Sequence, residues 1–254
     1  QEATLGSNHL LVAQSYYGLA KLYHALREYQ KAEEFCKQAL HIQERSLGNN
    51  HPVIASTLNI LAKIYQGQGR LEQAWEMNIR ALGIRENMSG VDHPHVAVVI
   101  NSLVEIYHAE GNYRDAEPLI ARSLRIYEQS LGPKHPYMAY SLSNQAENFF
   151  LQGEYNQAEA YYKMAQAIRE QHLGYEHPHT ASTYYDIACL YSAIERYEEA
   201  ESLYRKALII REHIFGTDHP IIASTLEQYA TLLRKQNREL EALELERTYQ
   251  DNQS

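Results

Sequence analysis

The sequence predicts an all-α protein, an α-solenoid of stacked helix pairs, and three observations support this prediction. The dipeptide His-Pro recurs every 42 residues from His51 onward, and a glycine stands three residues before each of its histidines. Alanines recur with the same period, one series starting at Ala13 and another at Ala32. Between these markers apolar residues recur at helical spacing, whereas no alternation of β-branched residues persists over six positions. A helix pair of this size cannot bury its apolar face alone, but stacked pairs share a continuous core.

The repeat at residues 51–92 shows the expected elements most clearly. Pro52 suits the first turn of a helix, where its missing N–H would have no partner. Apolar residues at three- and four-residue spacing over 55–65 then form one helical face. Gly67 interrupts the pattern, and a second helical face starts at Leu71. The glycine before the next His-Pro ends this second helix, because glycine adopts the left-handed cap conformation without steric cost.

The same markers divide the whole chain into six repeats. Before the first repeat we expect the last turn of a preceding helix. In the last repeat we expect a polar C-terminal helix, which would shield the end of the stack. The predicted segments are 1–8 for the helix end, and 9–50, 51–92, 93–134, 135–176, 177–218 and 219–254 for the repeats.

The composition argues against several classes of protein. The chain has 254 residues with 23 Lys and Arg against 32 Asp and Glu, a net charge of −9, which argues against a nucleic-acid binder that neutralises phosphates. No run approaches the roughly 18 apolar residues that a membrane helix needs, so we expect no membrane partner. Two cysteines, Cys36 and Cys189, cannot form a disulfide framework. We therefore expect a cytoplasmic protein.

The thirteen histidines raise the question of a metal or catalytic site. Adjacent His-Pro histidines lie one repeat apart, on the order of 10 Å for packed helices. Metal–nitrogen bonds are roughly 2 Å long, so these histidines cannot share one ion. We expect them to cap the helices that follow. The closer pair His93 and His95 has no carboxylate or thiolate at ligand spacing, and no phosphate-binding, dinucleotide, zinc-protease or nucleophile-elbow motif occurs. The sequence therefore predicts no cofactor, no metal and no enzymatic activity.

Residues 55–84 resemble the tetratricopeptide repeat. The residues that carry this resemblance are Leu58, Leu61, Ala62, Tyr65, Gly69, Leu71, Ala74, Ala81 and Leu82. The 42-residue period, with Leu47-Gly48 before His51-Pro52, is similar to the long version of the repeat found in kinesin light chains. The resemblance implies a right-handed α-solenoid of six stacked helix–turn–helix repeats, and a non-catalytic scaffold that binds proteins or peptides.

In this family the first helix of each pair lines the concave side of the superhelix, so the resemblance also implies which residues would contact a peptide. They are Tyr17, Lys21, Asn59, Lys63, Asn101, Glu105, Tyr140, Ser143, Glu147, Phe150 and Tyr185. Residue types at the groove positions vary between repeats while the packing positions stay constant, as expected of a selective surface on a uniform scaffold. The same variation also fits solvent-facing positions that carry no function.

Two groups of these residues suggest how a peptide would be recognised. Asn59 and Asn101 match the groove asparagines with which kinesin light chains hold an extended peptide, and a carboxamide can both donate to and accept from a peptide backbone. The charge along the groove changes sign between Lys63 and Glu105. A partner with acidic residues at one end and basic residues at the other would be complementary.

Two functions are therefore compatible with the sequence. The first is a protein- or peptide-binding scaffold that uses the concave groove. The second is a sensor or oligomerisation array that regulates an effector domain outside this chain, with self-association through the ends of the repeat array.

Overall fold

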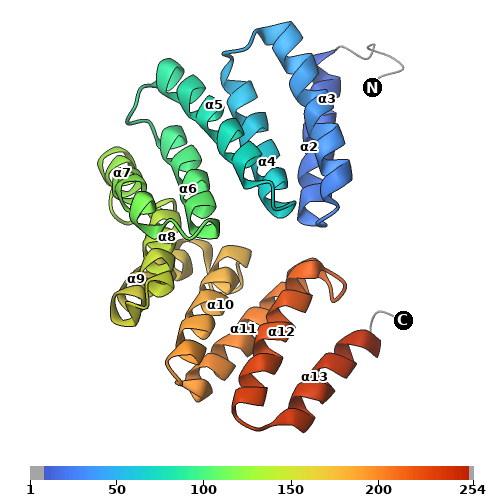
Figure 1. Ribbon diagram of the computed structural model, residues 1–254, viewed down its shortest axis with the longest axis vertical. Helices are drawn as coiled ribbons and strands as arrows, with labels where there is room; N and C mark the ends of the chain where they lie inside the picture. The colour runs from blue at the N-terminus through green and yellow to red at the C-terminus, as the bar shows by residue number, and fades with distance from the viewer. Residues whose placement is uncertain (1–8, 252–254) are drawn as a thin grey trace. The chain divides into compact units, whose positions relative to one another are not determined.

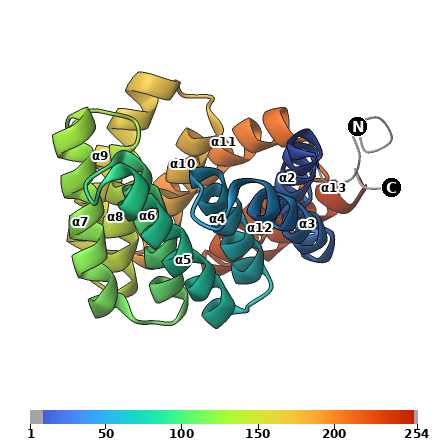
Figure 2. The ribbon, with the colours of Figure 1, turned by 90° about the horizontal axis from the view of Figure 1, so that it is seen from above.

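The computed structural model describes residues 9–251, which form consecutive helix pairs and contain no strand (Figure 1). The two helices of a pair contact each other, as α2 and α3 do where they lie side by side in Figure 1 and in Figure 2. The helices are α2 (Leu10–Ala25), α3 (Tyr29–Leu47), α4 (Pro52–Gly67), α5 (Leu71–Ser89), α6 (Pro94–Ala109), α7 (Tyr113–Leu131), α8 (Met138–Leu151), α9 (Tyr155–Leu173), α10 (Pro178–Ala193), α11 (Tyr197–Phe215), α12 (Pro220–Lys235) and α13 (Glu239–Asp251). The predicted all-α fold of helix–turn–helix repeats is confirmed.

The chain divides into two compact units, Gln1–Pro133 and Lys134–Ser254. The N-terminal unit contains three helix pairs, α2–α3, α4–α5 and α6–α7, and the C-terminal unit contains the pairs α8–α9, α10–α11 and α12–α13. Within a unit, the second helix of one pair packs against the first helix of the next, as α3 does against α4 and α9 against α10. The helix end expected at residues 1–8 lies outside the described residues.

Each first helix is preceded by a histidine whose ring accepts a backbone hydrogen bond. Nδ1 of His51 accepts from the N–H of Val53 at 3.2 Å. The equivalent histidines make the same bond at 3.1–3.2 Å, and these are His9, His93, His135, His177 and His219. The bond satisfies an N–H group that has no partner inside the helix. The predicted capping role is confirmed for His51, His93, His177 and His219, whereas the bond of His135 goes to Tyr137, which precedes helix α8.

The first helix of the fourth repeat begins later than the proline predicts. Helix α8 starts at Met138 rather than at Pro136, because the residues before it form a tighter turn. The N–H of Ala139 donates to the carbonyl of Pro136, and that of Tyr140 to the carbonyl of Tyr137, both at 3.2 Å. These bonds span three residues, the spacing of a 3₁₀ turn, instead of the four of an α-helix.

Left-handed backbone conformations end the second helices and form the turns between the helices of a pair. Gly48 follows α3 with φ 77°, and the equivalent glycines of later repeats share this sign. Gly69 turns the chain between α4 and α5 with φ 74°. At the position of Gly69 the other repeats carry Gly111 and Gly153 or, with φ of 57–63°, Arg27, Glu195 and Asn237. A side chain at such a position costs on the order of 1 kcal/mol, so packing and hydrogen bonds determine the turn in those three repeats.

The core of each pair is formed where two series of small residues meet. On the first helices the fully buried residues of this series are Ala20, Ala62, Val104, Ala146, Ala188 and Ala230. On the second helices they are Ala32, Ala74, Ala116, Ala158, Ala200 and Ala242. Small side chains let the two helix axes approach closely, and larger apolar residues such as Leu61 and Ile64 pack around them.

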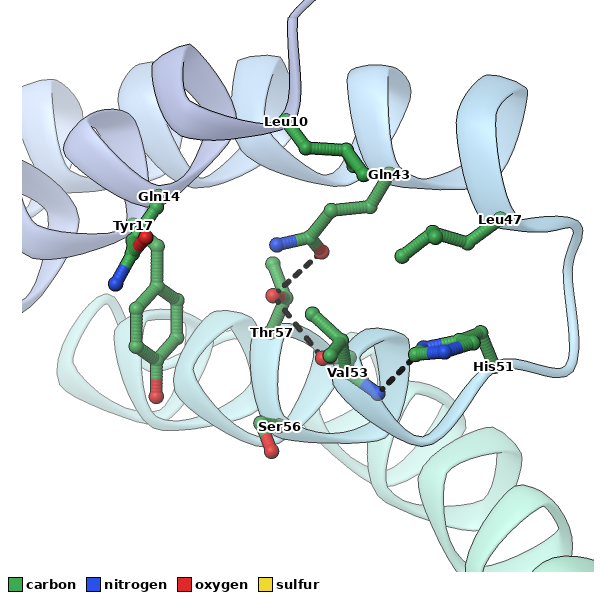
Figure 3. A pocket seen from close by; sticks show the side chains of 9 residues that line it. All are labelled: Leu10, Gln14, Tyr17, Gln43, Leu47, His51, Val53, Ser56 and Thr57. Carbon is green, nitrogen blue, oxygen red and sulfur yellow. Dashed lines mark hydrogen bonds between the residues drawn. The ribbon is translucent and has the colours of Figure 1, made fainter.

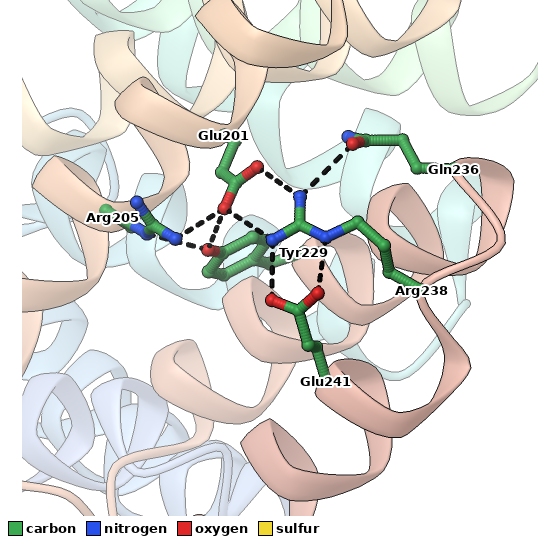
Figure 4. Close-up of polar contacts among 6 residues, drawn as sticks. All are labelled: Glu201, Arg205, Tyr229, Gln236, Arg238 and Glu241. Atoms are coloured by element: carbon green, nitrogen blue, oxygen red, sulfur yellow. Dashed lines mark hydrogen bonds and ion pairs between the residues drawn. The ribbon is translucent and has the colours of Figure 1, made fainter.

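An arginine in the turn of one pair binds a glutamate on the second helix of the preceding pair. Arg238 donates to Glu201 of α11, with an Nη1–Oε2 distance of 2.6 Å, and the hydroxyl of Tyr229 donates to the same carboxylate at 3.0 Å (Figure 4). Arg205 and Glu241 complete the network. The hydrogen bond from Arg238, the largest contribution, holds the pKa of the Glu201 carboxyl below its usual value.

The same contact, which we call the turn ion pair, recurs in two other places. Arg70 binds Glu33 at 2.8 Å, and Arg196 binds Glu159 at 2.9 Å. In both cases the guanidinium also stacks on a tyrosine, with 4.2 Å from Arg70 to the ring of Tyr65. The turn ion pair therefore joins the first two helix pairs of the N-terminal unit and all three pairs of the C-terminal unit.

Helix α13 has a mixed surface. Arg234 of α12 donates to both carboxylate oxygens of Glu246 at 2.9 Å, while Leu240 and Leu243 of α13 are 83% and 44% exposed. No helix of the described part of the chain is both long and apolar enough to cross a lipid bilayer.

We predict that Ala62→Leu lowers the free energy of unfolding by about 1–3 kcal/mol, because the added methyl groups have no space between α4 and α5. Urea unfolding followed by circular dichroism measures the change. Ala25→Leu, at an exposed alanine of α2, is the control and should change stability by less than about 0.5 kcal/mol. If Ala62→Leu is as mild as the control, the packing role of the alanine series is wrong.

Candidate functional site

The residues predicted to contact a peptide lie on the first helices of the pairs. Successive first helices contact one another, as α2 does with α4, α4 with α6, and α10 with α12. We call the side formed by α2, α4 and α6, and separately the side formed by α8, α10 and α12, the inner face of each unit. Six of the predicted residues belong to the N-terminal unit and five to the C-terminal unit.

Asn59 and Asn101 are tied into the helix packing of the N-terminal unit. Nδ2 of Asn59 donates to Oδ1 of Asn78 on α5 at 3.1 Å and to Oγ of Ser102 on α6 at 2.9 Å. Asn101 is only 7% exposed. The carboxamide of Asn59 therefore bridges its own helix pair and the next one.

The charged residues of this inner face come from both helices of the pairs. Lys21 is exposed, with Nζ 5.9 Å from the centre of the Tyr17 ring, and Lys63 is half-buried. Arg85, on the second helix α5, also reaches the inner face, because its Nη2 donates to Oγ of Ser56 at 2.6 Å. Glu105 on α6 is half-buried. Three cations, Lys21, Lys63 and Arg85, and one carboxylate, that of Glu105, therefore lie on this inner face.

A hollow of about 520 Å³ opens between α2, the end of α3 and the start of α4 (Figure 3). Its lining residues are Leu10, Gln14, Tyr17, Gln43, Leu47, His51, Val53, Ser56 and Thr57. Thr57 donates to Oε1 of Gln43 at 2.7 Å across its floor, and Leu10 and Val53 are both exposed. Burial raises the pKa of the Tyr17 phenol. The hollow offers apolar side chains beside a tyrosine hydroxyl and a glutamine.

Sequence reasoning identified only Tyr17 among these lining residues as a contact. The signal that could have revealed the hollow is the position of Gln43 in the repeat. The same position carries Arg85, Arg169 and Arg211 in three later repeats. The equivalent place in the C-terminal unit is occupied, because the guanidinium of Arg169 donates to Thr183 there. The shorter Gln43 leaves the space open.

In the C-terminal unit, two predicted tyrosines lie over buried arginines. The guanidinium of Arg169 is 5.3 Å from the ring centre of Tyr140, whose hydroxyl is 2.7 Å from Nε2 of His179. The guanidinium of Arg211 is 4.6 Å from the ring centre of Tyr185. Both arginines come from second helices, α9 and α11, and the sequence analysis did not single them out.

The other predicted residues of this unit differ in surroundings. Phe150 packs against the apolar core, with its ring centre 5.9 Å from that of Tyr155 on α9. Glu147 is half-buried on α8. Ser143 is half-buried as a residue, but its Oγ is fully buried and has no hydrogen-bond partner within residues 9–251. These residues lie on the same helix as Tyr140.

Asp186, which the sequence analysis did not single out, lies among these groups. Desolvation, with a further contribution from Glu147, raises the pKa of the Asp186 carboxyl to about 7, although Arg169 and Arg211 act in the opposite direction. The same burial lowers the pKa of both guanidinium groups. Two acids and two arginines therefore share a poorly hydrated part of the inner face.

The cysteines are poorly suited to nucleophilic chemistry. Burial raises the pKa of the Cys36 thiol to about 12, and it also raises that of Cys189. A thiol with a raised pKa stays protonated near neutral pH and is a weak nucleophile. Within the described residues, no three His, Cys, Asp or Glu side chains are grouped closely enough to hold a metal ion.

We predict that Asp186→Asn stabilises the protein more at pH 8 than at pH 5. The carboxyl has a pKa of 3.8 in the unfolded chain and about 7 when folded, so folding takes up a proton between these values. This group's contribution to stability is therefore lost as the pH rises through that range and levels off above 7. Asparagine carries no such penalty.

Urea unfolding of both proteins at pH 5, 6, 7 and 8 tests this prediction. Asp218→Asn, the same change at an exposed aspartate of the same unit, is the matched control. A stability difference between wild type and Asp186→Asn that is equal at pH 5 and pH 8 would contradict the assignment.

Comparisons with known proteins identify repeats of one kind along the chain. The family model described as tetratricopeptide repeat matches residues 11–87, 95–171, 139–212 and 193–252. No curated protein sequence matches the chain.

Several solved structures are similar to this fold. The putative kinesin light chain of Podosopora anserina, with nearly identical TPR-like repeats, is 25% identical, with a TM-score of 0.58 over 82% of this chain and 98% of that one. BtubC (BKLC) from P. vanneervenii is 16% identical, with a TM-score of 0.65 over 91% of each chain. A Rap protein complexed with Competence and Sporulation Factor is 15% identical, with a TM-score of 0.68 over 94% of this chain and 74% of that one.

Proposed function

Because the chain belongs to the tetratricopeptide repeat family, with repeats like those of kinesin light chains, we propose that it is a non-catalytic scaffold that binds a partner's peptide segment. The observation that carries the proposal is the hollow on the inner face of the N-terminal unit, where apolar side chains lie exposed beside cations. The Rap structure complexed with Competence and Sporulation Factor supports a similar use of this fold.

The hollow is suited to hold one apolar side chain of the segment. Its volume of about 520 Å³ lies within the range of ligand pockets, roughly 300–1,000 Å³. Leu10 and Val53 would lose their contact with water when an apolar group enters. Tyr17 adds a large contact area and has few rotamers to lose.

Charge determines which segment fits. Lys21, Lys63 and Arg85 favour acidic residues next to the anchoring side chain, and Glu105 favours a basic residue further along α6. In the C-terminal unit, Tyr140, Ser143, Glu147, Phe150 and Tyr185 would contact side chains of the partner.

The asparagines are proposed to hold the backbone of the segment. Since Nδ2 of Asn59 already donates to Asn78 and Ser102, its Oδ1 is the atom that we propose accepts from a peptide N–H. Asn101 would contribute in the same way one repeat further on. The two free cysteines fit the reducing cytoplasm as the place where this binding occurs.

We predict that peptides selected on the immobilised chain from a random display library depend on this face. Asn101→Ala should weaken a selected peptide by about 1–3 kcal/mol in binding free energy, because a buried peptide group loses its partner. Val53→Glu should abolish binding by placing a charge in the hollow. Lys63→Glu should weaken binding more at low salt than at 1 M, where the Debye length is about 3 Å. Fluorescence anisotropy with the labelled peptide measures all three.

The matched control for Lys63→Glu is Arg45→Glu, the same change of charge at an exposed residue of α3. It should change the affinity less than twofold. Equal losses in Arg45→Glu and in the inner-face variants would place the ligand elsewhere on the surface and refute the proposed site.

A second candidate function, self-association through the repeat ends, is supported by the outer side of α2. Leu19 and Leu22 are 36% and 54% exposed, whereas the equivalent Leu61 and Ile64 of α4 are buried against the preceding pair. Among the described residues, the helices in extensive contact with α2 are α3 and α4 of the same unit. An apolar side of this kind suits a second copy of the chain.

We predict that, if this face mediates self-association, the sedimentation coefficient rises with protein concentration for the wild type and not for Leu22→Glu. Leu240→Glu, the same change at an exposed leucine of α13, is the control and should behave like the wild type. A wild-type chain that remains monomeric up to about 100 μM would exclude this function.

A further inference from the structure

The inner face of the C-terminal unit lacks a hydrogen-bonding group that the N-terminal unit has. In the N-terminal unit, the carboxamide of Asn59 bridges Asn78 on the second helix and Ser102 on the next first helix. Two repeats later the equivalent positions carry Ser143, Tyr162 and Asp186. Serine carries a hydroxyl on Cβ in place of the carboxamide, so its side chain reaches less far and offers one polar atom instead of two, and it cannot form the bridge.

Two buried polar atoms of this unit, one on α8 and one on α11, have no hydrogen-bond partner within residues 9–251. Oγ of Ser143 is buried and has no partner in the described part of the chain. Arg211 is 4% exposed, and its Nε has no partner there either, although its Nη1 donates to Thr225 at 2.5 Å. Asp186 is half-buried, and the charge of Arg211 acts on its carboxyl. Buried polar groups are normally paired, so two unpaired atoms beside a half-buried carboxyl indicate a site for a ligand.

We propose that this cluster, which we call the amide site, binds a primary carboxamide, the side chain of an asparagine or glutamine on the partner segment. The amide nitrogen of the ligand would donate to the carboxylate of Asp186, and its oxygen would accept from Nε of Arg211. Oγ of Ser143 can donate to or accept from the same group. This inference rests on the proposed function, because it assigns one residue type to the peptide that the scaffold binds.

The charges around the site favour a neutral ligand over a charged one. Asp186 and Glu147 are balanced by Arg169 and Arg211, whose guanidinium groups lie under Tyr140 and Tyr185. A lysine or arginine of the partner would pair with the acids but leave Nε of Arg211 without an acceptor. A carboxylate would satisfy Arg211 but lie beside two acids. A carboxamide alone offers both a donor and an acceptor without adding charge.

The test uses four small probes with the full chain: the N-acetyl, N-methylamide derivatives of glutamine, glutamate, lysine and alanine. Each is titrated at millimolar concentration against ¹⁵N-labelled protein, and backbone amide shifts are followed by NMR. We expect the glutamine probe to give saturable shifts at Ser143 and Asp186, with at least tenfold weaker binding of the other three. The alanine probe carries the same backbone amides, so it separates side-chain recognition from backbone recognition.

Ser143→Asn supplies the missing carboxamide from within the chain and should abolish the saturable shifts. Ser202→Asn, the same change at an exposed serine of α11, should leave them unchanged. If Ser143→Asn does not fold, Asp186→Asn replaces it and should weaken the glutamine probe at least tenfold.

Three results would overturn the proposal: no saturable shift with the glutamine probe, a lysine or glutamate probe that binds as tightly as glutamine, or an alanine probe that does so. The outcome is independent of peptide anchoring in the N-terminal unit, because no probe carries an apolar anchor. Loss of library-peptide binding in Val53→Glu together with no glutamine shift would refute the amide site and leave the scaffold function intact.

Discussion

The close approach of the two helices in each pair is the constraint on which the rest of the structure depends. Ala62 on α4 and Ala74 on α5 are both fully buried, and alanines occupy both places in every repeat except the third, where Val104 replaces the first of them. Two helices at this distance have little freedom to rotate about their axes, because a large side chain at the interface would separate them. The residues on the opposite side of each first helix are therefore held at fixed positions. A constant interface between helices thus supports an inner face whose residues can change from repeat to repeat.

One repeat position determines whether a place on the inner face is open or filled. Gln43 binds Thr57 and leaves the hollow beside Tyr17, whereas Arg169 binds Thr183 and fills the corresponding space in the C-terminal unit. The filled place carries the cost of a buried cation, part of which its hydrogen bond and the ring of Tyr140 offset. The hollow beside Tyr17 exposes apolar surface, which water solvates poorly. The two units therefore present different chemistry from the same backbone, one an apolar hollow and the other a set of buried charges.

The fold was predictable from the sequence because each local signal recurs at the same place in successive repeats. A single His-Pro or a single alanine is weak evidence, but the same residue at the same place in successive repeats reveals both the helix starts and the buried positions. The sequence predicted which residues lie on the inner face, but it did not predict which side chains surround them. The structure shows what surrounds them, and much of it comes from second helices, such as Arg85 beside Ser56 and Arg211 beneath Tyr185. The repeat pattern of the first helices does not predict which long side chains of the second helices extend to the inner face. Asn59 illustrates the same limit, because its match to a peptide-binding asparagine did not show that its amide nitrogen bonds to Asn78.

The turn ion pair has a mechanical consequence for the N-terminal unit. Its first two helix pairs are joined at both ends, by Arg70 with Glu33 at the turn and by Arg80 with Glu44 near the opposite end. Between the second and third pairs the turn positions carry Trp75 and Asn112, which cannot form an ion pair, and the salt bridge of Arg122 with Glu86 joins only the opposite end. The junction between the second and third pairs therefore relies at its turn end on apolar contacts, with Ile106 of α6 in the same cluster as Ala62 and Tyr65 of α4. On the inner face, the hydrogen bond from Asn59 to Ser102 also joins these two pairs.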